Sequence, residues 1–306
     1  MMQPIHNQPQ YINLYGFSQA PFRLSPDPYF FFPSPTHLSA EKILAHAITS
    51  GEGFMVLSGR AGLGKTLLLR RLLEGFEPHR IPIIILSPAV EPLGLLQLLA
   101  GELDIEYSQD TSLAVLLQLF QNHILQMAEE NKELFIIIDE AQNMPIKTLE
   151  QLRMLSNLET GKRKLMQILL VGQSELDEVL TDPRLGQLVQ RIVVHENLQP
   201  LTREQIAHYV SYRLSKAGRA DIFLSKSGCR LLEKRSKGIP RMINRIMDRT
   251  LLFSSVEQAT LLSKKHIQSA IATMKDVAPK KRGPQLKAAL TLGSLAILSA
   301  LLVYLI

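Results

Sequence analysis

The chain has 306 residues, of which 46% are apolar and 20% are charged, so it is long enough for one large globular domain and a smaller one. Its formal charge of +6 raises the question of a nucleic-acid or anionic-membrane partner. Residues 275–287 hold five basic side chains and one acidic one, which supply most of that excess. The remainder lacks the broad basic character of a protein that binds a phosphate backbone, so we do not expect nucleic acid as a partner.

Two further features of the sequence point to a reducing compartment. Cys229 is the only cysteine, which excludes an internal disulfide and a thiolate metal cluster. The N-terminus has no charged stretch followed by an apolar one, as a secretory signal would. We therefore expect the bulk of the chain to be cytoplasmic.

Residues 1–40 are rich in proline and aromatic side chains, with a Pro-Asp-Pro step at 26–28. Proline and the residue before it disfavour a helix, so an extended and turning path is predicted. The aromatic side chains favour a segment that packs on the core.

From residue 41 to 201, short apolar runs alternate with helical stretches. The runs are continuous, as in strands buried on both faces of a parallel sheet. Pro82 cannot donate a ladder hydrogen bond, so its strand is placed at a sheet edge. Strands are predicted at Phe54–Ser58, Ile81–Leu86, Leu134–Ile138, Met166–Val171 and Ile192–Val194, and helices at Lys65–Glu74, Leu113–Ala128, Ile146–Asn157 and Ser174–Leu180. This alternation predicts a doubly wound α/β core.

After Thr202 the strand pattern ends, and residues 202–275 predict a small domain of about four helices. The Gly-Ile-Pro step at 238–240 marks the start of one of them, because proline is favoured in the first turn of a helix.

The C-terminal residues predict a membrane anchor. Residues 276–287 form a basic linker, and residues 288–306 then contain no charge. At about 1.5 Å rise per residue, a helix over them would span about 28 Å, close to the roughly 30 Å core of a bilayer. A buried core helix is the alternative. The basic linker would stay in the cytoplasm, which gives a single-pass anchor with the preceding domains on the cytoplasmic side.

A phosphate-binding loop is predicted at residues 59–66, between an apolar strand and a leucine-rich helix. The residues match the pattern G-x-x-x-x-G-K-[ST] at every fixed position; they are Gly59, Arg60, Ala61, Gly62, Leu63, Gly64, Lys65 and Thr66. Backbone N–H groups of such a loop and the following helix N-terminus bind phosphates, Lys65 reaches the β and γ phosphates, and the Thr66 hydroxyl binds Mg²⁺. A chance glycine turn is the alternative. ATP and Mg²⁺ are the cofactors expected.

Asp139 and Glu140 follow the predicted strand Leu134–Ile138, at the end where α/β sheets place their ligands. Beside a phosphate-binding loop, Asp139 is predicted to hold Mg²⁺ and Glu140 to orient and deprotonate the attacking water. Alone, two acids after a strand would be a solvated turn. Judged without a family resemblance, Gln173 would be only a turn residue after a strand, and Arg241 would be only a surface arginine.

The chain resembles AAA+ ATPases of the ExeA-like family, also called general secretion pathway protein A. The matching stretches are YGFSQAPFRLSPDPYF at 15–30, GRAGLGKT at 59–66, IIIDEAQNM at 136–144, LEQLRMLSNLET at 149–160, LLVGQSEL at 169–176, LVQRIVVHENLQPL at 188–201 and GIPRMINR at 238–245. The resemblance implies an AAA+ core at 41–201 with a helical lid at 202–275.

The resemblance also implies roles for individual residues. Gln173 would be sensor 1 and Arg241 sensor 2. Arg191 would be an arginine finger for the ATP of a neighbouring subunit, with Arg184 as the second candidate. The chain would then assemble into a ring, for example a hexamer. Residues 15–40 would lie near the adenine.

The function implied is that of an ATPase tethered to the bacterial inner membrane, which drives or gates an envelope machine for type II secretion, pilus biogenesis or exopolysaccharide export. The alternative is a DNA-binding AAA+ regulator of the transposition ATPase type. A third reading is a nucleotide-gated scaffold with negligible turnover. Glu140 argues against it, because a binding switch needs no acid that activates water.

Overall fold

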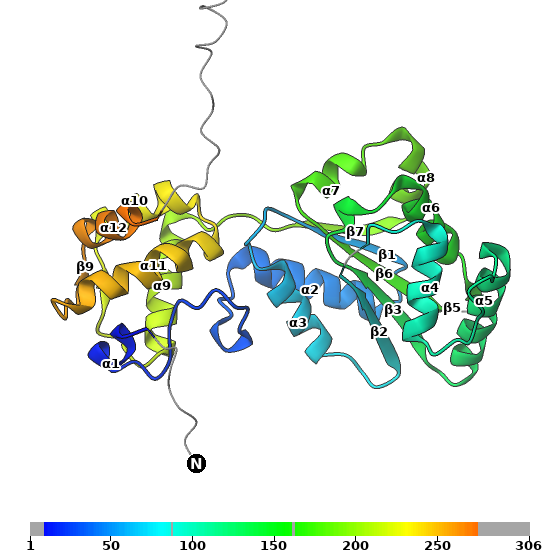
Figure 1. The fold of residues 1–306 in the computed structure, drawn as a ribbon, viewed down its shortest axis with the longest axis horizontal. Coiled ribbons are helices and arrows are strands. Elements are labelled where there is room, and N and C mark those ends of the chain that lie inside the picture. Colours follow the sequence, from blue (N-terminus) through cyan, green and yellow to red (C-terminus); the bar gives the residue numbers. More distant parts are fainter. Residues whose placement is uncertain (1–8, 87, 161–162, 275–306) are drawn as a thin grey trace, which may run out of the picture. The chain divides into compact units, whose positions relative to one another are not determined.

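The computed structural model describes residues 9–86, 88–160 and 163–274, and those up to Ile271 belong to one compact unit. Its centre is a five-stranded parallel sheet with the order β2-β3-β6-β1-β7 (Figure 1). The strands are β1 (Phe54–Ser58), β2 (Arg80–Ile85), β3 (Glu133–Ile138), β6 (Met166–Val171) and β7 (Ile192–Asn197). The predicted parallel α/β sheet is thus confirmed.

Burial separates the three central strands from the two edge strands. Every residue of β1 and β6 is buried, and so is β3 from Leu134 onward. Half-buried and exposed residues alternate along β7, and buried and exposed residues alternate in the second half of β2. The prediction of strands buried on both faces is therefore wrong for the edge strands, because only one of their faces is covered. Pro82 lies in β2, at the sheet edge where it was expected.

Helices cover both faces of the sheet (Figure 1). On one face, Met55 and Leu57 of β1 pack in a cluster with α2 (Pro35–Thr49) and α3 (Lys65–Glu74). On the other face, Phe54 and Val56 pack with a second set of helices. That set contains α4 (Pro92–Glu102), α5 (Leu113–Glu129), α6 (Ile146–Leu155), α7 (Ser174–Val179) and α8 (Gly186–Val189). Because successive strand residues point to opposite faces, one apolar run supplies both clusters.

Beyond the sheet, the chain forms α9 (Arg203–Lys216), α10 (Lys226–Ser236), α11 (Pro240–Ser255) and α12 (Lys264–Ala272). Helix α11 begins at Pro240. Two short strands, β8 (Phe223–Leu224) and β9 (Leu261–Leu262), pair in parallel among these helices, where the sequence predicted none. Strands of two residues are too short to show a periodic pattern. The remaining short elements are α1 (Tyr11–Tyr15), η1 (Pro28–Phe30), η2 (Ala141–Asn143), η3 (Pro183–Leu185), β4 (Glu159–Thr160) and β5 (Arg163–Lys164).

The N-terminal segment packs on the core through Phe31, but it is less extended than expected. It contains α1, and the core helix α2 already begins at Pro35 rather than after residue 40. Most of its polar contacts are with the helices after residue 202, and the Pro26 carbonyl also accepts from Arg70 of α3 at 3.3 Å. The Tyr15 hydroxyl donates to Ser254 Oγ at 2.8 Å, and the Tyr29 hydroxyl donates to the Lys216 carbonyl at 3.0 Å. Proline and aromatic content predicted that the segment packs, but it carried no information about which surface it packs on.

The predicted linker at 276–287 and the predicted membrane helix at 288–306 lie outside the described residues. Within the ranges given above, no helix has both the length and the apolar character needed to cross a bilayer.

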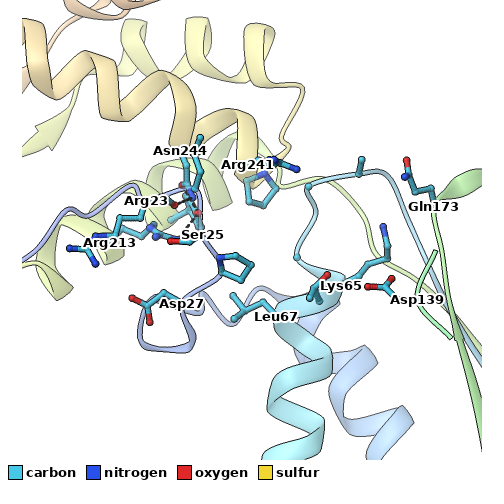
Figure 2. Close-up of a pocket in the computed structure, with 18 of the residues that line it drawn as sticks. Arg23, Ser25, Asp27, Lys65, Leu67, Asp139, Gln173, Arg213, Arg241 and Asn244 are labelled. Atoms are coloured by element: carbon cyan, nitrogen blue, oxygen red, sulfur yellow. Dashed lines mark hydrogen bonds between the residues drawn. The ribbon is translucent and has the colours of Figure 1, made fainter. Parts of the chain in front are cut away.

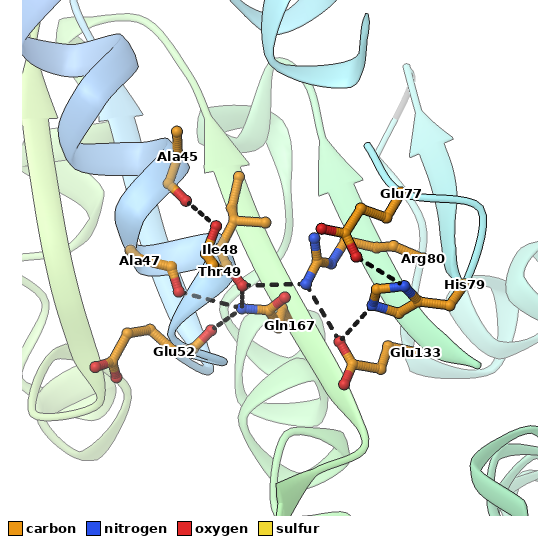
Figure 3. Close-up of polar contacts among 10 residues, drawn as sticks. All are labelled: Ala45, Ala47, Ile48, Thr49, Glu52, Glu77, His79, Arg80, Glu133 and Gln167. Carbon is orange, nitrogen blue, oxygen red and sulfur yellow. Dashed lines mark hydrogen bonds and ion pairs between the residues drawn. The ribbon is translucent and has the colours of Figure 1, made fainter. Parts of the chain in front are cut away.

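Helix α2 is anchored at its C-terminal end by polar contacts (Figure 3). Gln167, 3% exposed in β6, donates through Nε2 to the carbonyls of Ile48 at 3.1 Å and Glu52 at 2.9 Å. Arg80 Nη2 donates to the same Ile48 carbonyl and to Glu133 Oε2, each at 3.3 Å. The last carbonyls of a helix have no partner within the helix, so these side chains, with the Gly51 N–H that the Ile48 carbonyl accepts at 3.2 Å, supply their hydrogen bonds.

Substitution of Gln167 by Met is expected to lower the free energy of unfolding by about 1–3 kcal/mol, because the side chain keeps its length but its hydrogen bonds to the Ile48 and Glu52 carbonyls are lost. The measurement is urea unfolding followed by circular dichroism. Gln126→Met on the exposed surface of α5 is the matched control and should leave stability unchanged. Equal stability of the two variants would contradict the anchoring role.

Candidate active site

Three neighbouring strands deliver polar residues to the same edge of the sheet. At their carboxyl ends, β1 leads into the loop that begins at Gly59, β3 into Asp139 and Glu140, and β6 into Gln173. Since β3, β6 and β1 are adjacent and parallel, these residues meet. They line a pocket of about 370 Å³ together with Lys65, Thr66 and, from α11, Arg241.

Glycine is required at two positions of the loop because the backbone is left-handed there. Gly62 has φ 81° and Gly64 has φ 108°. A Cβ on Gly62 would lie 2.8 Å from the Cβ of Arg241, which is too close. The Arg241 N–H donates to the Gly62 carbonyl at 3.2 Å. The loop therefore touches the start of helix α11 directly, and a side chain at residue 62 would push the two apart.

Lys65 is the first residue of α3 and is only 8% exposed. Its Nζ donates to the carbonyls of Gly59 at 2.6 Å and Arg60 at 3.4 Å. Burial lowers the pKa of Lys65, and the nearby Glu140 and Asp139 oppose that shift. No side chain caps the N-terminus of α3. Lys65 is a buried cation held by neutral carbonyls, and it lies at a helix N-terminus without a side-chain cap. Both features favour the binding of a multiply charged anion such as a nucleoside triphosphate.

The two acids after β3 differ in environment. Burial raises the pKa of Asp139, whose Oδ1 accepts the N–H of Glu140 at 2.9 Å. Glu140 has a left-handed backbone with φ 53°, which costs a residue with a side chain about 1–2 kcal/mol. Both acids line the same pocket. A carboxylate and a threonine hydroxyl are oxygen ligands of the kind Mg²⁺ prefers, so Asp139 and Thr66 fit that ion.

Two amides hold the Glu140 carboxylate. Its Oε2 accepts from Gln173 Nε2 at 2.9 Å and from Gln142 Nε2 at 2.5 Å. The Gln173 hydrogen bond is the main reason that the pKa of Glu140 is lowered, and the Gln142 hydrogen bond adds to it. Gln142 also accepts the Gln173 N–H through Oε1 at 3.0 Å. The group is therefore ionised at neutral pH and can accept a proton.

The sequence did not assign roles to several residues that line the far end of the pocket. Figure 2 shows Arg23, Arg213 and Asn244 at one end and Asp139 and Gln173 at the other. Residues 23–27 of the N-terminal segment and Tyr209 of α9 also line it. Tyr209 donates to Asn244 Oδ1 at 2.6 Å, and Arg213 donates to the Tyr209 hydroxyl at 3.0 Å. Arg23 and Asn244 lie within the stretches at 15–30 and 238–245 that resemble the family, and the tertiary fold brings them together with Tyr209 and Arg213.

The structure places the remaining predicted residues outside this pocket. Arg60 is exposed, and Leu63 is buried in the core next to the loop. Arg191 is exposed just before β7, at the amino edge of the sheet, and donates to Ser156 Oγ at 3.2 Å. Arg184 pairs with Asp182 through Nη2 at 2.6 Å. Neither arginine lines the pocket that holds Lys65, so either could act only on the pocket of another subunit.

Replacement of Gln142 by Leu is expected to shift the low-pH limb of kcat/KM for ATP hydrolysis to higher pH. The pKa of Glu140 is lowered by its hydrogen bonds, so loss of a donor raises that pKa. The carboxylate is then protonated, and inactive as a base, at a higher pH than in the parent chain. The measurement is the pH profile of kcat/KM.

Gln126→Leu, on an exposed position of α5, is the control for that profile and should leave the limb in place. A limb that stays fixed in Gln142→Leu would mean that Glu140 is not the group titrating.

Comparisons with known proteins agree with this geometry. Residues 48–180 match a family model described as an AAA domain. The general secretion pathway protein A of Aeromonas hydrophila is 37% identical over 242 residues, which are 79% of this chain and 44% of that protein. The chain thus spans less than half the length of this relative.

Solved structures share the fold. Cdc6p from Pyrobaculum aerophilum superimposes with a TM-score of 0.61 at 17% identity, covering 85% of this chain and 70% of that one. The ORC1 protein of Aeropyrum pernix, solved in complex with DNA, gives a TM-score of 0.57 at 17% identity, covering 81% and 68%. At these identities the likeness concerns the fold alone.

Proposed function

We propose that this chain, which belongs to the AAA+ ATPases of the general secretion pathway protein A family, binds ATP with Mg²⁺ in the pocket around Lys65 and hydrolyses it. The observation that carries the proposal is the convergence of three strand ends on one pocket, with Arg241 opposite them. Hydrolysis of a nucleotide requires a group that binds the phosphates, a ligand for the metal ion and a group that activates water. Lys65, Asp139 and Glu140 would supply these three, and Gln173 after β6 would help to place the water.

Binding would be divided between the loop and β3. Lys65 and the N–H groups of residues 59–66 would bind the phosphates, while Thr66 and Asp139 would hold Mg²⁺. The ion would supply positive charge against the phosphate oxygens. The base and ribose would lie at the end of the pocket lined by residues 23–27 and Tyr209.

Glu140 would take the proton of the attacking water. Its lowered pKa keeps it ionised, and Gln142 and Gln173 fix the position of the carboxylate. Gln173, as sensor 1, would also donate to the water or the γ-phosphate. A general base at the right place contributes on the order of 10²–10⁴ to the rate.

Arg241 and Arg191 would act from different directions. Arg241, as sensor 2, reaches the pocket from α11 of the same chain and touches the loop through its backbone. Arg191 lies at the opposite edge of the sheet, so it would complete the pocket of a neighbouring subunit. A ring, for example a hexamer, is the assembly that satisfies this, with residues 41–201 as its core and 202–275 as its lid.

The chain would serve an envelope machine for type II secretion, pilus biogenesis or exopolysaccharide export. The name of its relative, general secretion pathway protein A, supports the secretion role. The uncharged residues 288–306 would tether it to the bacterial inner membrane, with the ATPase in the cytoplasm.

A mixing experiment tests the shared active site. Glu140→Gln lacks the base but keeps Arg191, whereas Arg191→Ala keeps the base but lacks the finger. Each alone is expected to lose at least about 100-fold in turnover. An equal mixture should regain activity, because one subunit then supplies the base and its neighbour the arginine. The measurement is phosphate release at several concentrations of the full chain.

Arg184→Ala mixed with Glu140→Gln is the matched control, because Arg184 is also an exposed arginine outside the pocket. Arg184→Ala alone is expected to keep its turnover; loss in Arg184→Ala that is recovered in the mixture, with Arg191→Ala alone still active, would make Arg184 the finger. If Arg191→Ala and Arg184→Ala each keep the turnover of the parent chain, the subunits work alone and the ring should be abandoned.

Deletion of residues 288–306 tests the tether. The shortened chain is expected to move from the membrane pellet to the soluble fraction of lysed cells, because the uncharged segment is gone. Its nucleotide affinity should equal that of the full chain, which serves as the folding control. A shortened chain that still pellets with membranes would contradict a tether by these residues.

A further inference from the structure

His37 connects the N-terminal segment to the phosphate-binding loop. It is 5% exposed, in the first turn of α2, and none of the motifs above includes it. Its Nε2 lies 2.9 Å from the carbonyl oxygen of Leu63, and its Nδ1 lies 2.7 Å from Ser34 Oγ. The ring of Phe31 packs edge-on against the imidazole with centroids 5.9 Å apart.

These contacts determine which nitrogen of His37 carries the proton. A carbonyl oxygen only accepts, so Nε2 must be the donor to Leu63. In the neutral ring Nδ1 is then an acceptor, which the Ser34 hydroxyl satisfies by donating. Ser34 is 1% exposed and is the N-cap of α2, so its position is fixed by the helix. Burial lowers the pKa of His37, which favours this neutral form.

The hydrogen bond from His37 fixes one particular peptide plane. In a trans peptide the carbonyl and the following N–H point in opposite directions. With the Leu63 carbonyl directed at His37, the Gly64 N–H points away from it. Gly64 itself lines the pocket that contains Lys65. The bond therefore directs one N–H group of the loop toward the place where phosphates would lie.

The local backbone conformation does not determine the orientation of the Leu63–Gly64 peptide plane. A peptide plane reverses when ψ of the first residue and φ of the second change together, and Gly64 has no side chain to resist it. Leu63 is 1% exposed in the core, so its side chain can stay in place while the plane turns. A hydrogen-bond donor that is fixed on one side of the Leu63–Gly64 peptide therefore favours one of its two orientations.

The donor is rigidly supported. Helix α2 is held at its other end by Gln167 and Arg80, which bind the Ile48 carbonyl. An ideal Cβ on Gly64 would lie 3.1 Å from His37 Nε2, so the imidazole is already close against the loop backbone. The loop and the start of α2 are therefore packed as one unit.

We propose that His37 is a positioning residue, which holds the Leu63–Gly64 peptide so that the Gly64 N–H faces the phosphates of the nucleotide. This rests on the proposed nucleotide binding at the same pocket. The N-terminal segment thereby takes part in phosphate binding through Ser34 and His37, without touching the phosphates itself.

The test compares His37→Gln with His37→Met in the full chain. The two side chains have similar length, but only the glutamine amide can donate to the Leu63 carbonyl. The dissociation constants of ADP and of adenosine are measured by competition against a fluorescent ADP, with thermal unfolding as the folding control. His37→Met should weaken ADP about 10- to 100-fold, as for loss of a hydrogen bond to a charged group, and leave adenosine unchanged. His37→Gln should stay within about threefold for both ligands.

Equal ADP affinity in both variants, or a loss that is the same for ADP and adenosine, would overturn the role of His37, because a general structural defect would not depend on phosphates. If His37→Met does not fold, Ser34→Ala takes its place, with the expectation of weaker ADP binding and unchanged adenosine binding. A parent chain that binds neither ADP nor ATP would instead overturn the proposed function.

Discussion

The parallel pairing of β3, β6 and β1 is the constraint on which the pocket depends. Parallel neighbours end at the same edge, so Lys65, Asp139 and Gln173 meet although they are far apart in the chain. The three strands are almost wholly buried, which makes a shift in register costly, since it would turn apolar side chains toward the wrong cluster. The geometry of the site is therefore as rigid as the core itself.

Helix α2 connects the two edges of that sheet. At the amino edge, Gln167 and Arg80 satisfy its last carbonyls, and at the carboxyl edge His37 donates to the Leu63 carbonyl of the loop. Both contacts join buried polar groups whose partners are also buried, so each is worth more than a surface hydrogen bond. The phosphate-binding loop is thus supported from outside its own motif.

The N-terminal segment and the helices after residue 202 share the other side of the pocket. Tyr15 and Tyr29 bind those helices, while residues 23–27 line the pocket beside Tyr209. Arg241 contacts the loop through its backbone N–H. In the proposed function, a change at the phosphates would reach these helices through Gly62 and Arg241, without a separate connecting element.

The sequence by itself determined the elements with a local physical signature. The five strands of the sheet, the loop at 59–66, helix α3, the break at Pro240 and the edge position of Pro82 follow from apolar runs, glycine and proline, which act on their own backbone. The acidic pair after β3 could be found because strand ends carry ligands.

Only the tertiary structure decided which distant groups meet. Packing between segments far apart in sequence brings Gln173 to the carboxylate of Glu140, which Gln142 also binds. It also brings His37 to the loop and the N-terminal segment to the helices after residue 202. A lone glutamine or histidine looks the same in a sequence whether its partner is water or a buried carbonyl. Its role depends on a neighbour that the local pattern does not contain.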